Sequence, residues 1–219
     1  MKACDFCDEF SDGRSNAFIL RYLPELLDRT ILATRRFRVI PSVGQIAQGH
    51  LLVVPIKHFC ALADLSKEHT EELENLCVEV RTILREVYGA CVFFEHGIRG
   101  AESGGCGIDH AHLHAVPVAA DGVLDLLKRE FRGSNLSSFQ HVKEMIPADA
   151  SYLFFEDVVG DRYVFPVANL PSQYMRKLVA DSIGKADWDW RECGREPELL
   201  STLQQLPQLF SAAAIANKG

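Results

Sequence analysis

The stretch DHAHLHAVPV, residues 109–118, places a histidine at every second position three times, at His110, His112 and His114. It is short, apolar between the histidines and interrupted by Pro117, a pattern that predicts a strand. Because side chains alternate between the two faces of a strand, the three imidazoles are expected to share one face. Three interpretations are open: a zinc ion held with one open coordination position, a histidine nucleophile oriented by its neighbours, or a solvated polar face.

The composition limits the class of protein. The chain has 219 residues, 47% of them hydrophobic, which is enough for one domain or for one domain with a sizeable extension. Its net charge of −7 makes nucleic acid an unlikely ligand. No apolar run approaches the roughly 20 residues of a membrane span, and the first residues lack the apolar core of a signal peptide. The seven cysteines are scattered, which is typical of a reducing compartment, so we expect a cytoplasmic protein.

Hydrophobic patterning predicts an α+β fold in the first half of the chain. Residues 35–42, 50–56 and 91–97 read as strands, and residues 66–89 read as one long amphipathic helix. Ser66 is a suitable N-cap for that helix and Gly89 a suitable end. Strands that flank a single helix favour an antiparallel sheet with the helix packed on it.

The pattern starts again after residue 120. The sequence predicts a helix over residues 121–133, a hairpin over residues 151–167 and a second helix over residues 171–184. Ser172 is the expected N-cap of the last helix. We therefore expect a boundary near residue 120, with the chemistry in residues 1–120 and an α+β extension in residues 121–219.

Two stretches carry a resemblance to a known family. GHLLVVPIKH, residues 49–58, and GGCGIDHAHLHAVP, residues 104–117, flank the long helix. Together they resemble the histidine-triad (HIT) superfamily of nucleotide hydrolases and transferases, and the likeness covers residues 1–118. It implies a HIT-like fold, with an antiparallel sheet and one long helix, and a nucleotide or nucleotide conjugate as substrate.

The resemblance implies a role for each histidine of the motif. His112 would attack an α-phosphate and form a covalent nucleotidyl-histidine, which water or another acceptor then resolves. His114 would donate to the phosphate oxygens, and His50 would orient the triad. The expected catalytic residues are therefore His112, His114 and His50, and the expected nucleotide contacts are Ser42, His114 and Gly105.

The zinc-bearing members of the family imply a metal site as well. Its ligands would be Cys4, Cys7, His58 and His110. Two thiolates and two imidazoles complete a tetrahedral coordination sphere, so one structural zinc per chain is expected. No organic cofactor is expected.

Two positions depart from the family pattern. Many members carry Ser or Thr where this chain has Gly107, and Asp where it has Ser42. A hydroxyl at the first position assists the leaving group. Its loss favours anhydride substrates such as dinucleoside polyphosphates, whose leaving groups need no proton, over nucleoside phosphoramidates.

A second function stays open beside the enzyme. Residues 175–193, MRKLVADSIGKADWDWREC, are similar to the tail of a eukaryotic histidine-triad-like branch linked to RNA lariat processing. Exposed tryptophans favour interfaces, and this stretch holds Trp188 and Trp190. The alternative is a nucleotide-binding adaptor with a vestigial site and a protein or RNA partner. A homodimer is compatible with the resemblance.

Overall fold

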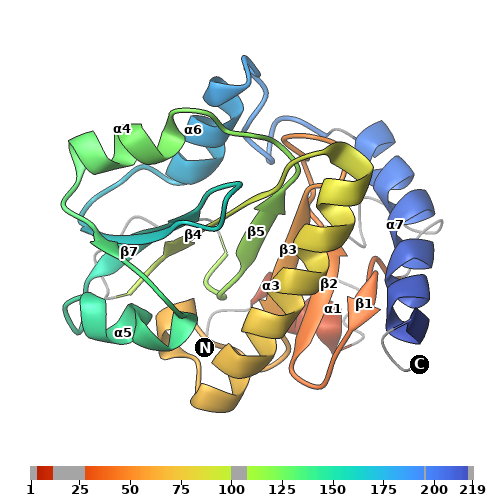
Figure 1. Cartoon of the computed structure of the whole chain (residues 1–219), viewed down its shortest axis with the longest axis horizontal. Coiled ribbons are helices and arrows are strands. Elements are labelled where there is room, and N and C mark those ends of the chain that lie inside the picture. The colour runs from red at the N-terminus through yellow and green to blue at the C-terminus, as the bar shows by residue number, and fades with distance from the viewer. Residues whose placement is uncertain (1–3, 12–27, 100–107, 195, 217–219) are drawn as a thin grey trace.

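The computed structural model of the chain describes residues 4–11, 28–99, 108–194 and 196–216. Within these residues, eight strands form one antiparallel sheet in the order β1-β2-β3-β5-β4-β7-β8-β6 (Figure 1). The strands are β1 (Leu32–Ala33), β2 (Phe37–Pro41), β3 (Leu51–Pro55), β4 (Val92–Gly97), β5 (Leu113–Val116), β6 (Ser134–Asn135), β7 (Ser151–Glu156) and β8 (Arg162–Val167). The α-helices are α1 (Asp5–Phe10), α3 (Lys67–Tyr88), α4 (Val123–Glu130), α5 (Val142–Met145), α6 (Tyr174–Ser182) and α7 (Glu196–Ala216). The α+β expectation is confirmed.

Helix α3 begins and ends where its sequence predicts. Ser66 is its N-cap and Gly89 its C-cap, with a φ of 88° that a residue without a side chain adopts at little cost. Its buried stripe, which includes Leu73, Val80 and Leu84, lies on one face of the sheet. No described helix is long and apolar enough to cross a membrane.

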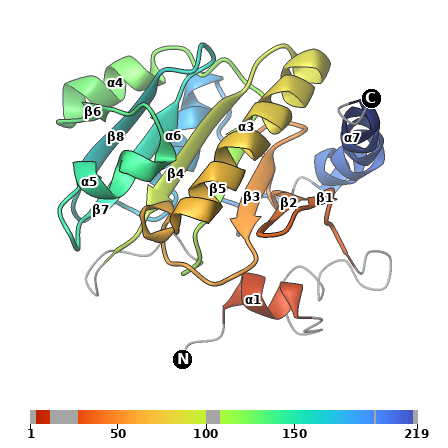
Figure 2. The same cartoon turned by 60° about the horizontal axis from the view of Figure 1, so that its bottom comes forward.

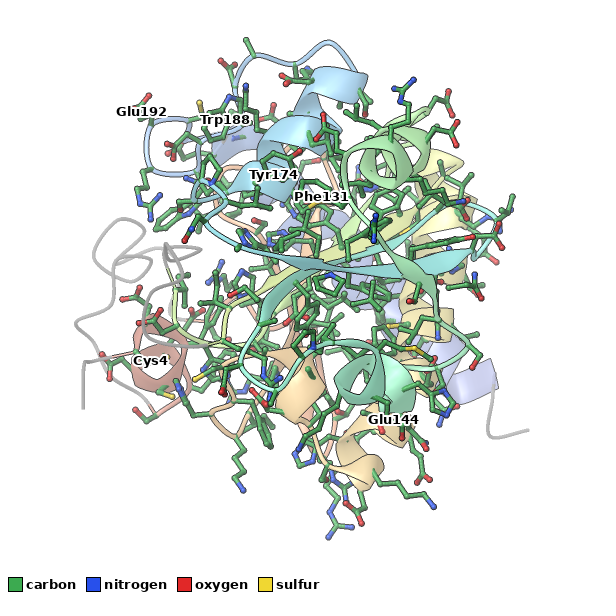
Figure 3. All side chains as sticks on the ribbon, turned by 90° about the vertical axis from the view of Figure 1, so that its left-hand side faces the viewer. Cys4, Phe131, Glu144, Tyr174, Trp188 and Glu192 are labelled. Atoms are coloured by element: carbon green, nitrogen blue, oxygen red, sulfur yellow. The ribbon has the colours of Figure 1, made fainter. Side chains whose placement is uncertain are left out.

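The two faces of the sheet carry different layers. Helices α3 and α5 cover one face, where the largest core cluster forms, and α4 and α6 cover the other (Figures 2 and 3). Successive residues of a strand point to opposite faces of the sheet. On β4, Phe93 belongs to the α3 side and Phe94 to the α6 side. On the α6 side, a separate small cluster packs Phe6 of α1 against β2 and β3.

Strand β5 is shorter than its sequence suggests. The sequence predicts a strand through the whole histidine stretch, but regular pairing covers only Leu113–Val116. The neighbouring strand β3 ends at Pro55, which has no N–H to donate. Ala111 N donates instead to Phe59 O, at 2.7 Å. His110 and His112 therefore precede the strand, and only His114 lies within it.

The segment after residue 120 continues the same sheet. Strand β7 pairs with β4 in a register that runs from Phe93↔Glu156 to Gly97↔Tyr152. The expected boundary falls between β5 and α4, and strands from both sides of it share one sheet. Helix α7 is not among the elements predicted from the sequence, and it packs Leu206 and Phe210 into the main core.

The start of α6 differs from the expectation. Its N-cap is Gln173 and not Ser172. Gln173 adopts a φ of 61°, a left-handed conformation that side chains rarely adopt outside functional or tightly held positions. Its amide is held at both ends, since Nε2 donates to Asp189 Oδ1 at 2.7 Å and Oε1 accepts from Trp190 N at 3.2 Å.

Candidate functional site

A pocket opens on the α6 side of the sheet, beside the histidines. His112 and His114 line it, and α1 contributes Asp5, Phe6 and Glu9. The segment after residue 120 supplies a further wall, which is made of Gln173, Met175, Arg176 and Trp190. The histidines thus lie where α1 and the start of α6 meet over the sheet, and both halves of the chain form the pocket.

Hydrogen bonds fix the tautomers of His50 and His114. Ile46 N donates to His50 Nδ1 at 3.3 Å, so the proton of neutral His50 lies on Nε2. That Nε2 lies 2.9 Å from His114 Nδ1 and donates to it. His114 must then carry its own proton on Nε2, which leaves an N–H donor on the imidazole edge that borders the pocket. The ring of Phe94 stacks on His114, with 4.3 Å between centroids, and holds its plane.

His112, the middle histidine of the triad, has the opposite tautomer to His114. His112 Nδ1 lies 2.6 Å from the carbonyl oxygen of His110 and donates its proton there. Nε2 of His112 is therefore unprotonated and carries a lone pair. One histidine with a free lone pair stands beside another with an N–H donor, and their ring centroids are 5.0 Å apart.

The protonation equilibria keep these rings neutral. Burial is the main cause that lowers the pKa of each triad ring in the pocket, and the positive charge of Arg176 acts in the same direction. Burial, followed by the positive charge of Arg176, also holds the pKa of His50 well below its usual range. Neutral imidazole is the form that acts as a nucleophile or as a single N–H donor.

The four expected metal ligands come together. The ligand atoms of Cys4, Cys7, His58 and His110 all lie within 4.8 Å of one another. His110 Nδ1 is 3.3 Å from Cys4 Sγ and 3.7 Å from Cys7 Sγ, and His58 Nδ1 is 3.4 Å from Cys7 Sγ. A tetrahedral zinc with ordinary Zn–S and Zn–N bonds separates its ligand atoms by about 3.3–3.8 Å. The geometry of the four side chains fits that ion.

The orientation of His110 fits a metal too. Its Nε2 donates to Pro55 O at 2.8 Å, which leaves Nδ1 as the nitrogen that faces the thiols. Among the described residues, no second cluster of this kind was found, and this one includes a single histidine of the triad. A zinc ion held by all three triad histidines has no support in this arrangement.

The expected nucleotide contacts are only partly described. Ser42 is buried and lines the pocket, where it accepts a hydrogen bond from Arg176 Nη1 at 3.3 Å. Gly105, and with it Gly107, lies outside the described residues. His114 lies in the pocket wall, as above.

Sequence reasoning missed several pocket residues. His96 is buried in the wall, and burial, followed by repulsion from the protonated form of His112, lowers its pKa to about 4. The alternation of side chains along β4 could have revealed it. Phe94 pairs with His114, and His96 lies two residues further along β4, so it faces the same side of the sheet. Arg176 is 4% exposed. Its only indication in the sequence is that a positively charged residue lies on the apolar face of the predicted helix 171–184.

The two tryptophans are used inside the fold. Trp188 packs against the core cluster on the α6 side of the sheet, and Trp190 lines the pocket. Figure 3 shows Trp188 beside α6, near Tyr174. Both side chains are half-buried, so part of each ring stays accessible and the adaptor alternative remains open.

The chain is similar to known proteins over its first half and over part of the segment after residue 120. Residues 29–132 match a family described as "Protein similar to CwfJ C-terminal". CWF19-like protein 1 of Pongo abelii is 24% identical over 174 residues, which cover 73% of this chain and 31% of that protein. The protein of the same name from Mus musculus is 24% identical over 166 residues, 68% of this chain and 29% of its own. The chain thus spans about three tenths of the length of these curated relatives.

Solved structures with the histidine-triad description are also similar. A hypothetical histidine triad nucleotide-binding protein from Sulfolobus tokodaii is 24% identical, with a TM-score of 0.39, over 52% of this chain and 68% of that one. A Zn-bound histidine triad family protein from Mycobacterium smegmatis is 22% identical, with a TM-score of 0.36, over 52% of this chain and 74% of that one.

Proposed function

We propose that the chain is a nucleotide hydrolase or nucleotidyltransferase that acts at an α-phosphate through His112. The observation that carries the proposal is the pair of opposite tautomers in the pocket. The Nδ1 proton of His112 is bound to the His110 carbonyl, so Nε2 holds the lone pair, and His114 offers an N–H beside it. One attacking atom and one donor, side by side, are what phosphoryl transfer to a histidine requires.

The covalent step follows from these atoms. Nε2 of His112 would form a bond to the α-phosphorus while the bond from phosphorus to the leaving group breaks, and the leaving group departs with the electron pair. The imidazole gains positive charge as that bond forms, and its Nδ1–H bond to the His110 carbonyl stabilises it. The Nε2–H of His114 would donate to a non-bridging oxygen, whose charge grows in the transition state.

A second attack completes the cycle. Water, or another acceptor, would attack the same phosphorus while the Nε2–P bond breaks. The electron pair of that bond returns to the ring of His112, which becomes neutral again, and the nucleotidyl group leaves on the acceptor, whose displaced proton passes to solvent. Zinc in the Cys4, Cys7, His58 and His110 cluster would serve structure, because its four positions are filled by protein and none is open to substrate.

The test is a trapped intermediate. The protein is incubated with diadenosine tetraphosphate, quenched in alkali and digested, and the peptide that contains His112 is examined by mass spectrometry. We expect an added nucleotidyl mass on that peptide, and its loss in His112→Asn together with a fall in kcat of several orders of magnitude. His141→Gln, which changes a histidine outside the pocket, is the matched control and should keep both.

The outcomes separate the two candidate functions. Retention of more than a few per cent of turnover in a folded His112→Asn protein would reject the covalent mechanism. Nucleotide binding without an adduct and without turnover, across a panel of nucleotide conjugates, would favour the adaptor with a vestigial site.

A further inference from the structure

One of the two tryptophans of the chain borders the pocket that holds the triad. Trp190 lines this pocket together with His112 and His114. Two phenylalanine rings line it as well, but Phe6 and Phe94 are each 1% exposed and already contact triad histidines. Trp190 is half-buried, so among the Phe and Trp rings of the described pocket wall it is the one with surface left for a ligand.

The backbone of Trp190 is held on several sides. Its N–H donates to Gln173 Oε1 at 3.2 Å, and the next N–H along the chain, that of Arg191, donates to Asp189 Oδ1 at 2.9 Å. Its Cα packs so closely on Gly44 that a Cβ added to that glycine would lie 2.6 Å away. The indole is therefore presented to the pocket from a fixed backbone, which lowers the entropy that a contact with a ligand costs.

The indole ring has one face covered by a cation. The Cζ atom of Arg191 lies 5.0 Å from the centroid of the Trp190 ring. The opposite face is left for a flat group that enters the pocket. A nucleobase is such a group, and stacking of a base on an aromatic side chain raises affinity by roughly 5- to 150-fold.

We propose that the indole of Trp190 stacks on the nucleobase of the bound nucleotide, so that the segment after residue 120 supplies the base subsite of the pocket. The inference rests on the proposed function, because it presumes that a nucleotide binds beside His112. It adds how the base is recognised. Every base offers a π-face, so stacking tolerates all four common bases, and the wider ring system of a purine should gain more from it than a pyrimidine.

Fluorescence can test the contact, because the chain has only two tryptophans. Trp188→Phe leaves Trp190 as the only indole, and Trp190→Phe leaves Trp188. Each variant is titrated with the four common nucleoside 5′-monophosphates and with ribose 5-phosphate, which lacks a base. Free tryptophan amide corrects for light that the bases absorb. We expect the nucleotides to quench the emission of Trp188→Phe and to leave that of Trp190→Phe unchanged, and ribose 5-phosphate to quench neither.

Calorimetry measures how much the stacking contributes. Trp190→Leu keeps an apolar side chain without a π-face, so it should weaken nucleotide binding by about fivefold or more, and the binding of ribose 5-phosphate by less than twofold. Trp190→Phe should restore most of the loss, because it returns an aromatic ring. Phe131→Leu changes a half-buried ring on the same side of the sheet but outside the pocket (Figure 3), and should bind as the wild type does.

The outcomes distinguish this inference from the proposed function. Nucleotide binding that leaves the emission of Trp188→Phe unchanged, or that is undiminished in folded Trp190→Leu, would overturn the base subsite and leave the proposed function standing. If Trp190→Leu does not fold, the fluorescence pair decides, and if Trp188→Phe does not fold, the wild-type chain takes its place in that pair. A wild-type chain that binds neither the nucleotides nor ribose 5-phosphate would remove the proposed function and this inference with it.

Discussion

The ring of Phe6 lies edge-on to the ring of His112, with 5.6 Å between their centroids and 67° between their planes. Phe6 sits between Cys4 and Cys7 in the chain and also makes an edge contact with His110. Helix α1, which follows its N-cap Cys4 and contains Cys7, therefore packs directly on the expected nucleophile. Whatever holds α1 in place also holds one wall of the pocket.

The first prediction concerns this link. Purified protein should contain about one zinc per chain, and Cys4→Ser should lower that content and the Tm by roughly 5 °C or more, since metal binding contributes to folding. Cys193→Ser, which changes a half-buried free thiol outside the four ligand positions, is the control. Metal analysis and calorimetry check it. Zinc at full occupancy in Cys4→Ser would contradict the ligand set.

The second prediction follows from the contact between His50 and His114. Without the Nε2–H donor of His50, His114 is no longer forced to carry its proton on Nε2. His50→Ala should therefore reduce kcat by about 10- to 100-fold, the range for loss of an orienting partner, with a smaller change in KM. Nitrogen NMR of the His114 ring should show a mixture of tautomers in the variant and one tautomer in the wild type. An unchanged single tautomer would contradict the relay.

The third prediction concerns the continuity of the sheet. Five residues of β4, from Phe93 to Gly97, lose their partners if β7 is removed, and their backbone becomes an open apolar edge. A fragment of residues 1–120 should therefore aggregate, or give a poorly dispersed NMR spectrum, whereas the full chain should be a well-dispersed protein. A soluble, folded fragment 1–120 would mean that the two halves are independent domains.

Local pattern was enough for some elements and not for others. Helix α3 could be predicted because its apolar stripe repeats with the helical period and Gly89 marks its end. Strand β5 was overestimated because the alternation of histidines continues beyond the point where β3 can supply partners. The alternation of side chains along β4 places His96 beside the triad only once β4 and β5 are known to be neighbours.

The pocket residues after residue 120 were out of reach for a different reason. Arg176 and Ser42 are 134 residues apart in the chain, and their contact exists only because α6 packs on the same sheet as the triad. The resemblance that assigns roles to residues ends at residue 118, and the similarity of residues 175–193 to the tail of another branch implies no role for Arg176. The metal ligands were predicted from that resemblance, and the fold brings all four together although Cys4 and His110 are 106 residues apart.

The last prediction uses His96 as a probe of the pocket. Its pKa is about 4 in the folded chain, chiefly because of burial, against an ordinary value of 6.5. Between those values the unfolded chain binds a proton that the folded chain does not, so the free energy of unfolding must fall as pH falls. The contribution is absent above pH 6.5, grows by about 1.4 kcal/mol for each pH unit below it, and levels off near pH 4. His96→Gln removes this term, so its free energy of unfolding should depend less steeply on pH than that of the wild type between pH 6.5 and 5. Urea unfolding of both proteins at pH 7.5, 6.5, 5.7 and 5.0 measures the difference, and the metal ligands affect both proteins alike. Parallel curves would mean that His96 is not held neutral in the pocket.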